Sequence, residues 1–161
     1  MAGSQPRRHQ PRLPRERLAH CDFGVVGCAR RDQLHRNHAQ EERELVAAVA
    51  HPAVGLVVDA WHVFRAGTSL AELAAALAQS AIFGVELDDA APEVIGSLFE
   101  DTVQRRLLCD EGCFDLRGLV QLLRDKGFDG PWGVEILSVA FRELPVTGAL
   151  QRAADTARKV L

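Results

Sequence analysis

Acidic side chains recur at the ends of three short aliphatic segments of this sequence. Asp59 follows GLVV, Glu86 lies in AIFGVELDD, and Glu135 lies in PWGVEIL. If these segments are neighbouring strands, their carboxylates converge and repel one another, and a divalent cation would relieve the repulsion. Carboxylate oxygens favour Mg²⁺ or Mn²⁺, and a nearby imidazole such as that of His62 also admits Co²⁺ or Zn²⁺. The three acids are therefore candidates for a metal site.

The spacing within each segment determines which face of a strand the acid occupies. Side chains alternate between the two faces of a strand, so Leu56 and Val58 share one face and Asp59 lies on the other. In the other two segments a glycine and a glutamate likewise alternate with two large aliphatic residues. The aliphatic face is suited to packing against helices. The face with the acids is suited to the interior of a barrel, which opens at the carboxyl ends of its strands.

Ordinary structural roles would also account for these acids. Asp59 could cap a following turn, and Glu86 and Glu135 could form salt bridges. The basic residues available for such pairs are Arg105, Arg106 and Lys126. The recurrence of the acid at the same place in three segments favours the metal site over these roles.

Helices and strands that would position the acids alternate along the chain. The sequence predicts strands over 54–60, 81–89 and 131–137 and helices over 41–51, 69–79, 114–127 and 145–161. Ser69 and Glu72 have the spacing of a capping box, and Asp115 is placed to cap the helix after a long charged connection. Strands that alternate with helices predict a parallel sheet with helices outside it.

The first 40 residues differ in composition from the rest. They contain eight arginines, three acidic residues and three prolines, without a periodic apolar pattern. We expect residues 1–40 to be poorly ordered, with one short strand near 21–27, and residues 41–161 to form the domain. The cysteines lack the close pairs of a zinc framework and are expected to be free thiols. They are Cys21, Cys28, Cys109 and Cys113.

Composition limits the classes of partner. The chain has 161 residues, 47% of them hydrophobic, which is enough for one substantial core. A net charge of −3 gives no general attraction to nucleic acid or to a membrane surface. We find neither an apolar run of membrane-spanning length nor a secretory segment, so we expect a cytoplasmic protein that binds neither nucleic acid nor membrane.

Three segments together resemble a known family. VGLVVDAWH, IFGVELDDA and RRLLCDEGCFDLRGLVQLLRDKGFDGPWGVEIL are similar to the carboxyl-terminal half of the sugar phosphate isomerase/epimerase family, which belongs to the xylose isomerase-like TIM barrels. The resemblance covers residues 45–161. It implies an α/β fold, roughly half of a TIM-type β/α barrel with parallel strands and outer helices. A whole barrel of this type takes about 250 residues.

The resemblance also implies roles for individual residues. Asp59 and Glu135 match two of the family's metal ligands, and the third ligand falls at Glu86. Many relatives have His or Gln at this third position, so Asp88 or Asp89 is the alternative ligand. Glu135 would also be the catalytic base. The residues implied to contact the substrate are His62, Arg105 or Arg106, and Trp61.

For the family, the implied reaction is isomerisation or epimerisation of a sugar, sugar phosphate or cyclitol by metal-assisted proton transfer next to a carbonyl. The family's first ligand, a Glu, should lie near residues 22–30, where Asp22 is the one acid. We therefore expect a truncated chain with impaired activity. The alternative is a non-catalytic half-barrel remnant or binding module whose open sheet edges are covered by a second copy. An endonuclease IV-like repair enzyme would need more histidines than His62 after residue 60.

Overall fold

The computed structural model describes residue 44 and residues 46–51, 54–77 and 82–161. Residues 46–49 are helical, within the range predicted for the first helix. The expectations for residues 1–40, including a strand near 21–27, lie outside the described residues. The elements in chain order are β1 (Leu56–Asp59), α2 (Ala60–Arg65), α3 (Leu70–Ala76), β2 (Ile82–Leu87), α4 (Leu98–Gln104), α5 (Leu116–Asp125), β3 (Trp132–Val134), α6 (Val139–Arg142) and α7 (Val146–Val160).

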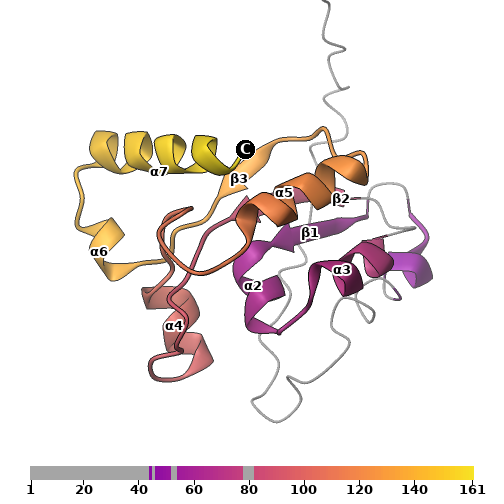
Figure 1. The fold of residues 1–161 in the computed structure, drawn as a ribbon, viewed down its shortest axis with the longest axis horizontal. Coiled ribbons are helices and arrows are strands. Elements are labelled where there is room, and N and C mark those ends of the chain that lie inside the picture. The colour runs from indigo at the N-terminus through magenta and orange to yellow at the C-terminus, as the bar shows by residue number, and fades with distance from the viewer. Residues whose placement is uncertain (1–43, 45, 52–53, 78–81) are drawn as a thin grey trace, which may run out of the picture.

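The three strands form one parallel sheet in the order β1-β2-β3. Parallel neighbours require a crossover connection, and helices provide it here: α2 and α3 lie between β1 and β2, and α4 and α5 lie between β2 and β3. Figure 1 shows α3 and α5 in front of the sheet and α7 beside β3. This is the alternation of strands and outer helices that the sequence predicts.

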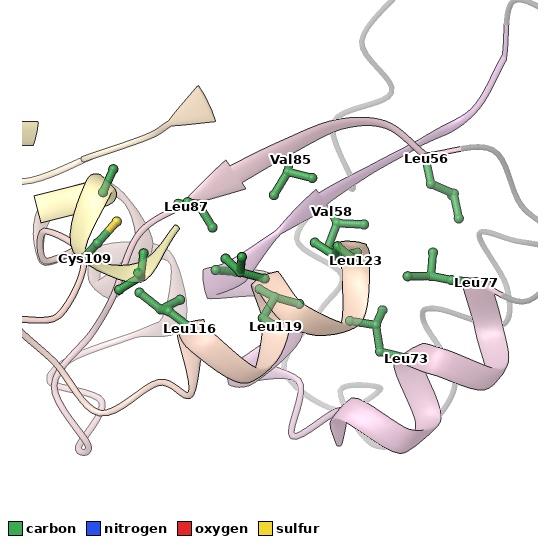
Figure 2. Close-up of a cluster of buried hydrophobic side chains, with 14 residues drawn as sticks. Leu56, Val58, Leu73, Leu77, Val85, Leu87, Cys109, Leu116, Leu119 and Leu123 are labelled. Atoms are coloured by element: carbon green, nitrogen blue, oxygen red, sulfur yellow. The ribbon is translucent and has the colours of Figure 1, made fainter. Parts of the chain in front are cut away.

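The aliphatic face of the sheet builds the hydrophobic core. Leu56 and Val58 of β1 and Val85 and Leu87 of β2 are buried and point toward the helices (Figure 2). The helices and the C-cap of α3 contribute these buried side chains to the same cluster: Ala60, Leu73, Leu77, Leu116, Leu119, Val120, Leu123, Ala157 and Val160. Burial of one Leu or Val side chain contributes about 1.5–3 kcal/mol, so this cluster fixes the sheet against its helices. The opposite face of the strands is therefore left to carry the acids.

Local signals in the sequence determine where two of the helices begin. Ser69 and Glu72 form the predicted capping box: the Ser69 side chain accepts from the Glu72 N–H, and the Glu72 carboxylate accepts from the Ser69 N–H. Asp115 accepts from the Gly118 N–H at the start of α5. After α5 the chain turns at Gly127, whose φ of 84° is favourable for glycine.

Three of the helices in the described residues were not predicted. These are α2, α4 and α6, of six, seven and four residues. α4 lies in the long connection and begins with a second capping box, formed by Ser97 and Glu100. Cys109 is buried and Cys113 is exposed, and both are free thiols. Within the described ranges, the length and apolar character needed to cross a bilayer are not found together in any helix.

Candidate metal site

The carboxyl ends of the three strands bring Asp59, Glu86 and Glu135 together. Asp59 is the register partner of Glu86, and Glu86 is the register partner of Gly133, two residues before Glu135. All three acids therefore leave the sheet on the same face. Each offers a carboxylate oxygen, and these oxygens lie within 4.8 Å of one another. Oxygens at this spacing could hold one cation between them.

Asp59 is oriented by the helix that follows it. It is the last residue of β1 and the N-cap of α2, and its Oδ1 accepts a hydrogen bond from the His62 N–H at 3.2 Å. Its Oδ2 accepts from Arg106 Nη1 at 2.9 Å. A helix cap and a member of the acidic cluster were alternative roles for Asp59. The structure shows both: Oδ1 caps α2, while Oδ2 accepts from Arg106 in the cluster.

Arg106 lies at the centre of the acidic group. Its side chain is 2% exposed, and its Nη1 contacts Asp88 Oδ2 and lies 2.9 Å from Glu135 Oε2 in addition to Asp59. Nε and Nη2 donate to Thr102, and the guanidinium carbon lies 5.4 Å from the centre of the Trp61 ring. A salt bridge between Glu135 and an arginine was one of the alternatives to a metal site. The ion pair is present, although it belongs to a larger acidic group.

Asp88 is the most deeply buried acid of the group. Its Oδ2 accepts from Arg106, and the Trp61 backbone N–H also favours its ionised form. Within the described residues, its buried Oδ1 lacks a hydrogen bond of ordinary geometry. Burial, followed by repulsion from Asp59, raises the pKa of Asp88 well above its usual value although Arg106 opposes the shift. Its deep burial distinguishes Asp88 from the three acids that converge at the strand ends.

The charges around Arg106 fit a bound cation. Three carboxylates, those of Asp59, Asp88 and Glu135, contact one guanidinium, and Glu86 lies in the same cluster as two of them. Burial and repulsion from Glu135 and Asp59 raise the pKa of the half-buried Glu86, which is the signature of an acid that lacks enough positive charge nearby. A divalent ion among these oxygens would supply that charge.

His62 lies beside the same group. Its Nε2 is 3.8 Å from Asp59 Oδ2. Burial lowers the pKa of His62 below 6.5, an effect that the carboxylates of Asp59 and Glu135 oppose. A neutral imidazole at pH 7 can accept or donate a hydrogen bond to a substrate oxygen, or join a metal ion as a nitrogen ligand.

Asp89, the second alternative for the third ligand, has a structural task. Its carboxylate accepts from the backbone N–H groups of Ala90, Gly112 and Phe114. It therefore holds the loop after β2 against the loop before α5. The structure leaves Glu86 as the third acid in the described cluster, with Asp88 bound to Arg106 and Asp89 bound to backbone.

The remaining candidates occupy different environments. Trp61 is buried, and its Nε1 donates to Asp101 Oδ2 at 3.2 Å, while its ring lies against Arg106. Arg105 is exposed and forms a backbone bridge with Ser138. The sequence reasoning missed Thr102 and Asp101, which hold Arg106 and Trp61. The i,i+4 spacing of Thr102 and Arg106 is the one signal that could have found the first of these pairs.

Comparison with known proteins places this geometry in a family. The family model for the xylose isomerase-like TIM barrel matches residues 20–160. The chain belongs to this family. For a xylose isomerase-like chain, three parallel strands with helices outside them form part of a β/α barrel. The predicted family and the predicted partial barrel fold are both confirmed.

Two curated relatives of this xylose isomerase-like chain are enzymes. It is 30% identical over 118 residues to an inosose isomerase of Halalkalibacterium halodurans, a match that covers 73% of this chain and 40% of the relative. It is 30% identical over 127 residues to a 3-dehydroshikimate dehydratase of Pseudomonas putida, covering 79% of this chain and 19% of the relative. The chain thus spans less than half the length of either relative.

Two solved structures are also similar to this chain over part of their length. A crystal structure of the IolI protein with a bound zinc atom superposes with a TM-score of 0.63 and 29% sequence identity, over 73% of this xylose isomerase-like chain and 41% of IolI. A fusion of a xylose isomerase-like TIM barrel with a 4-hydroxyphenylpyruvate dioxygenase superposes with a TM-score of 0.59 and 28% identity, over 74% and 18% of the two chains.

Proposed function

We propose that this chain is the metal-binding, carboxyl-terminal part of a cyclitol or sugar isomerase-like protein, and that Asp59, Glu86 and Glu135 hold a divalent ion. The observation that carries the proposal is the convergence of three carboxylate oxygens within 4.8 Å at the strand ends. The similarity to an inosose isomerase supports the substrate class, and the zinc atom of IolI supports the metal. The substrate is a small cyclitol, sugar or sugar phosphate in the cytoplasm.

The residues of the site would have separate roles in proton transfer. A bound ion would act as a Lewis acid that stabilises negative charge on substrate oxygens. Glu135, whose side chain is 38% exposed, would remove the proton next to the carbonyl. Arg106 and His62 would hydrogen-bond substrate oxygens, with Arg105 at the rim of the site. The ring of the buried Trp61 would position the Arg106 guanidinium.

The choice of ion follows from the donor set. Three carboxylates alone favour Mn²⁺ or Mg²⁺, which accept water readily at their remaining positions. With the neutral imidazole of His62 as a fourth donor, Co²⁺ or Zn²⁺ would be held as well. We propose Mn²⁺ as the first ion to test, because the described cluster consists of oxygens.

We further propose that turnover is low. The family's first Glu would fall near residues 22–30, where the sequence offers Asp22 instead. A two-base epimerisation would lack its second base, whereas a one-base isomerisation would retain Glu135. Among the described strands β1 and β3 are edges of the sheet, which supports the alternative of a half barrel that associates with a second copy.

Calorimetric titration with Mn²⁺ tests the metal site. We expect weak binding to the wild type and at least a tenfold loss of affinity, about 1.4 kcal/mol, in Asp59→Asn and in Glu135→Gln. Asp110→Asn is the matched control, because Asp110 pairs with the exposed Arg117. Equal affinity in all four proteins would remove the metal site. Isomerisation of an inosose is then assayed with the loaded wild type, and turnover that survives Glu135→Gln would contradict the role of Glu135 as the base.

A further inference from the structure

One nitrogen of Arg106 serves more acceptors than it has protons. Nη1 carries two N–H protons, and its hydrogen bonds go to Asp59 Oδ2 and Asp88 Oδ2. Glu135 Oε2 lies 2.9 Å from the same nitrogen as an ion pair in addition to these bonds. The guanidinium therefore neutralises three carboxylates incompletely, and a cation with more coordination positions would serve them better.

The other two guanidinium nitrogens, Nε and Nη2, bond to Thr102 and not to the acids. Nε donates to the carbonyl and hydroxyl oxygens of Thr102, and Nη2 donates to Thr102 Oγ1 at 2.8 Å. The Trp61 ring lies against the guanidinium. These contacts involve neither Asp59 nor Glu135, so a small displacement of Nη1 could release both acids while Nε and Nη2 keep their bonds to Thr102.

Asp88 is the acid that would keep its bond to Arg106 after Asp59 and Glu135 are released. Its carboxylate is fully buried, its Oδ2 accepts from Arg106, and the Trp61 backbone N–H also favours its ionised form. Once Asp59 has transferred to the ion, the guanidinium can move toward Asp88, which would then be its main anionic partner.

We propose that Arg106 is a built-in counter-cation that exchanges with the metal ion. Without metal, Nη1 neutralises Asp59 and Glu135. When the ion binds, these two acids transfer to it, and Arg106 remains bound to Asp88 and Thr102. The inference rests on the proposed metal function of Asp59 and Glu135. It adds that the ion must compete with a residue of the same chain, and that metal loading frees one side of the guanidinium for a substrate oxygen.

Calorimetry with Mn²⁺ alone tests the exchange. Arg106→Gln removes the competitor, so we expect its Mn²⁺ affinity to rise about tenfold. Arg158→Gln removes the same charge from an exposed residue of α7 that pairs with Asp155, and should change the affinity less than twofold. If Arg106→Gln binds Mn²⁺ no more tightly than the wild type while Asp59→Asn still weakens binding, the exchange is wrong and the metal site stands. If the wild type and Arg106→Gln both bind no Mn²⁺, the proposed metal function fails first.

A double-mutant cycle separates exchange from general electrostatics. Asp88→Asn weakens metal binding in any case, because it removes a nearby negative charge. If Asp88 also receives the displaced guanidinium, Asp88→Asn should weaken binding at least threefold more in the wild-type background than in the Arg106→Gln background. Equal effects in the two backgrounds would overturn the role of Asp88.

Trp61 fluorescence gives a readout that does not depend on whether Arg106→Gln folds. The chain has two tryptophans, so Trp132→Phe leaves Trp61 as the one emitter. Since Trp61 lies 5.4 Å from the Arg106 guanidinium carbon, displacement of the guanidinium by Mg²⁺ should change the emission of Trp61. Emission that stays constant while calorimetry shows the ion to be bound would overturn the exchange.

Discussion

Asp59 and Glu86 are direct register partners on the neighbouring parallel strands β1 and β2, so their side chains leave the sheet side by side. Like charges directly opposite on neighbouring strands destabilise a sheet. The pKa of Glu86 is raised accordingly, first by burial and then by repulsion from Glu135 and Asp59. Repulsion between these carboxylates thus destabilises the fold locally, at the place where the proposed ion would bind.

Glu86→Gln should stabilise the metal-free protein and weaken metal binding. Because the folded-state pKa of Glu86 lies above its ordinary value of 4.5, the ionised form destabilises the fold at pH 7. The gain in melting temperature in EDTA should therefore be present at pH 7 and vanish below about pH 4, where the carboxyl is protonated in both states. Mn²⁺ affinity should fall at least threefold. Glu143→Gln, at an exposed site, is the control; a lower melting temperature for Glu86→Gln at pH 7 would contradict the prediction.

His62→Gln should make the metal-free protein less sensitive to mild acid. The pKa of His62 is lowered by burial, so below about pH 6.5 the unfolded chain takes up a proton before the folded one does. The wild type then loses stability as the pH falls from 6.5 through the lowered pKa, and the variant lacks this component. Urea unfolding in EDTA at pH 7.5 and pH 5.5 measures the difference. The same loss in both proteins would show that His62 is not responsible.

Asp89→Ala should destabilise the protein by about 2–4 kcal/mol. The change leaves three backbone N–H groups, those of Ala90, Gly112 and Phe114, without their acceptor. Gly112→Ala should have a similar effect, because its new Cβ would overlap Asp89 Oδ1 and the Ala90 carbonyl oxygen.

Gly148→Ala is the control for the glycine change. Gly148 lies inside α7, where an added Cβ meets nothing within 4 Å, so this change should stabilise the protein by about 0.5–1 kcal/mol. Urea unfolding measures all three variants. If Asp89→Ala is as stable as the wild type, the proposed anchoring of the two loops is wrong.

The two described cysteines should differ in reactivity. Burial, followed by repulsion from Asp88, raises the pKa of Cys109 to about 12, whereas Cys113 is exposed. At pH 8 the Cys109 thiolate is scarce and shielded, so N-ethylmaleimide should modify Cys113 at least tenfold faster. Peptide mass spectrometry identifies the modified site. Both cysteines should react at similar rates in urea, and similar rates without urea would contradict the burial of Cys109.

Much of the acidic cluster could be predicted because it depends on local periodicity. The alternation of side chains along a strand places Asp59, Glu86 and Glu135 on one face wherever three such strands lie parallel. The same argument, applied to Leu56 and Val85, predicts the face that packs against the helices. The sequence does not contain the strand order itself, although alternation of strands and helices predicts a parallel sheet.

The central position of Arg106 could not be predicted in this way. It follows α4 in a connection without apolar period, and its place depends on contacts between distant segments, such as the bridge between Asp89 and Leu107. The sequence analysis expected Arg106 to contact substrate or to form one salt bridge, and it treated Asp88 as a spare ligand. Their mutual burial is a tertiary effect. α4 itself carried a readable signal, the capping box of Ser97 and Glu100, within a segment whose charges suggested a loop.

The Asp-x-x-His spacing of residues 59–62 has a simple origin in the N-cap of α2. Asp59 is the cap, and His62, three residues later, supplies the N–H that its carboxylate accepts. The interval between acid and imidazole is therefore fixed by one helical turn. Insertion of a single residue between them would rotate the imidazole by about 100° around the helix axis and break the cap at the same time. We therefore expect this stretch to tolerate substitutions such as Asp59→Asn in folding, and to tolerate no change in length.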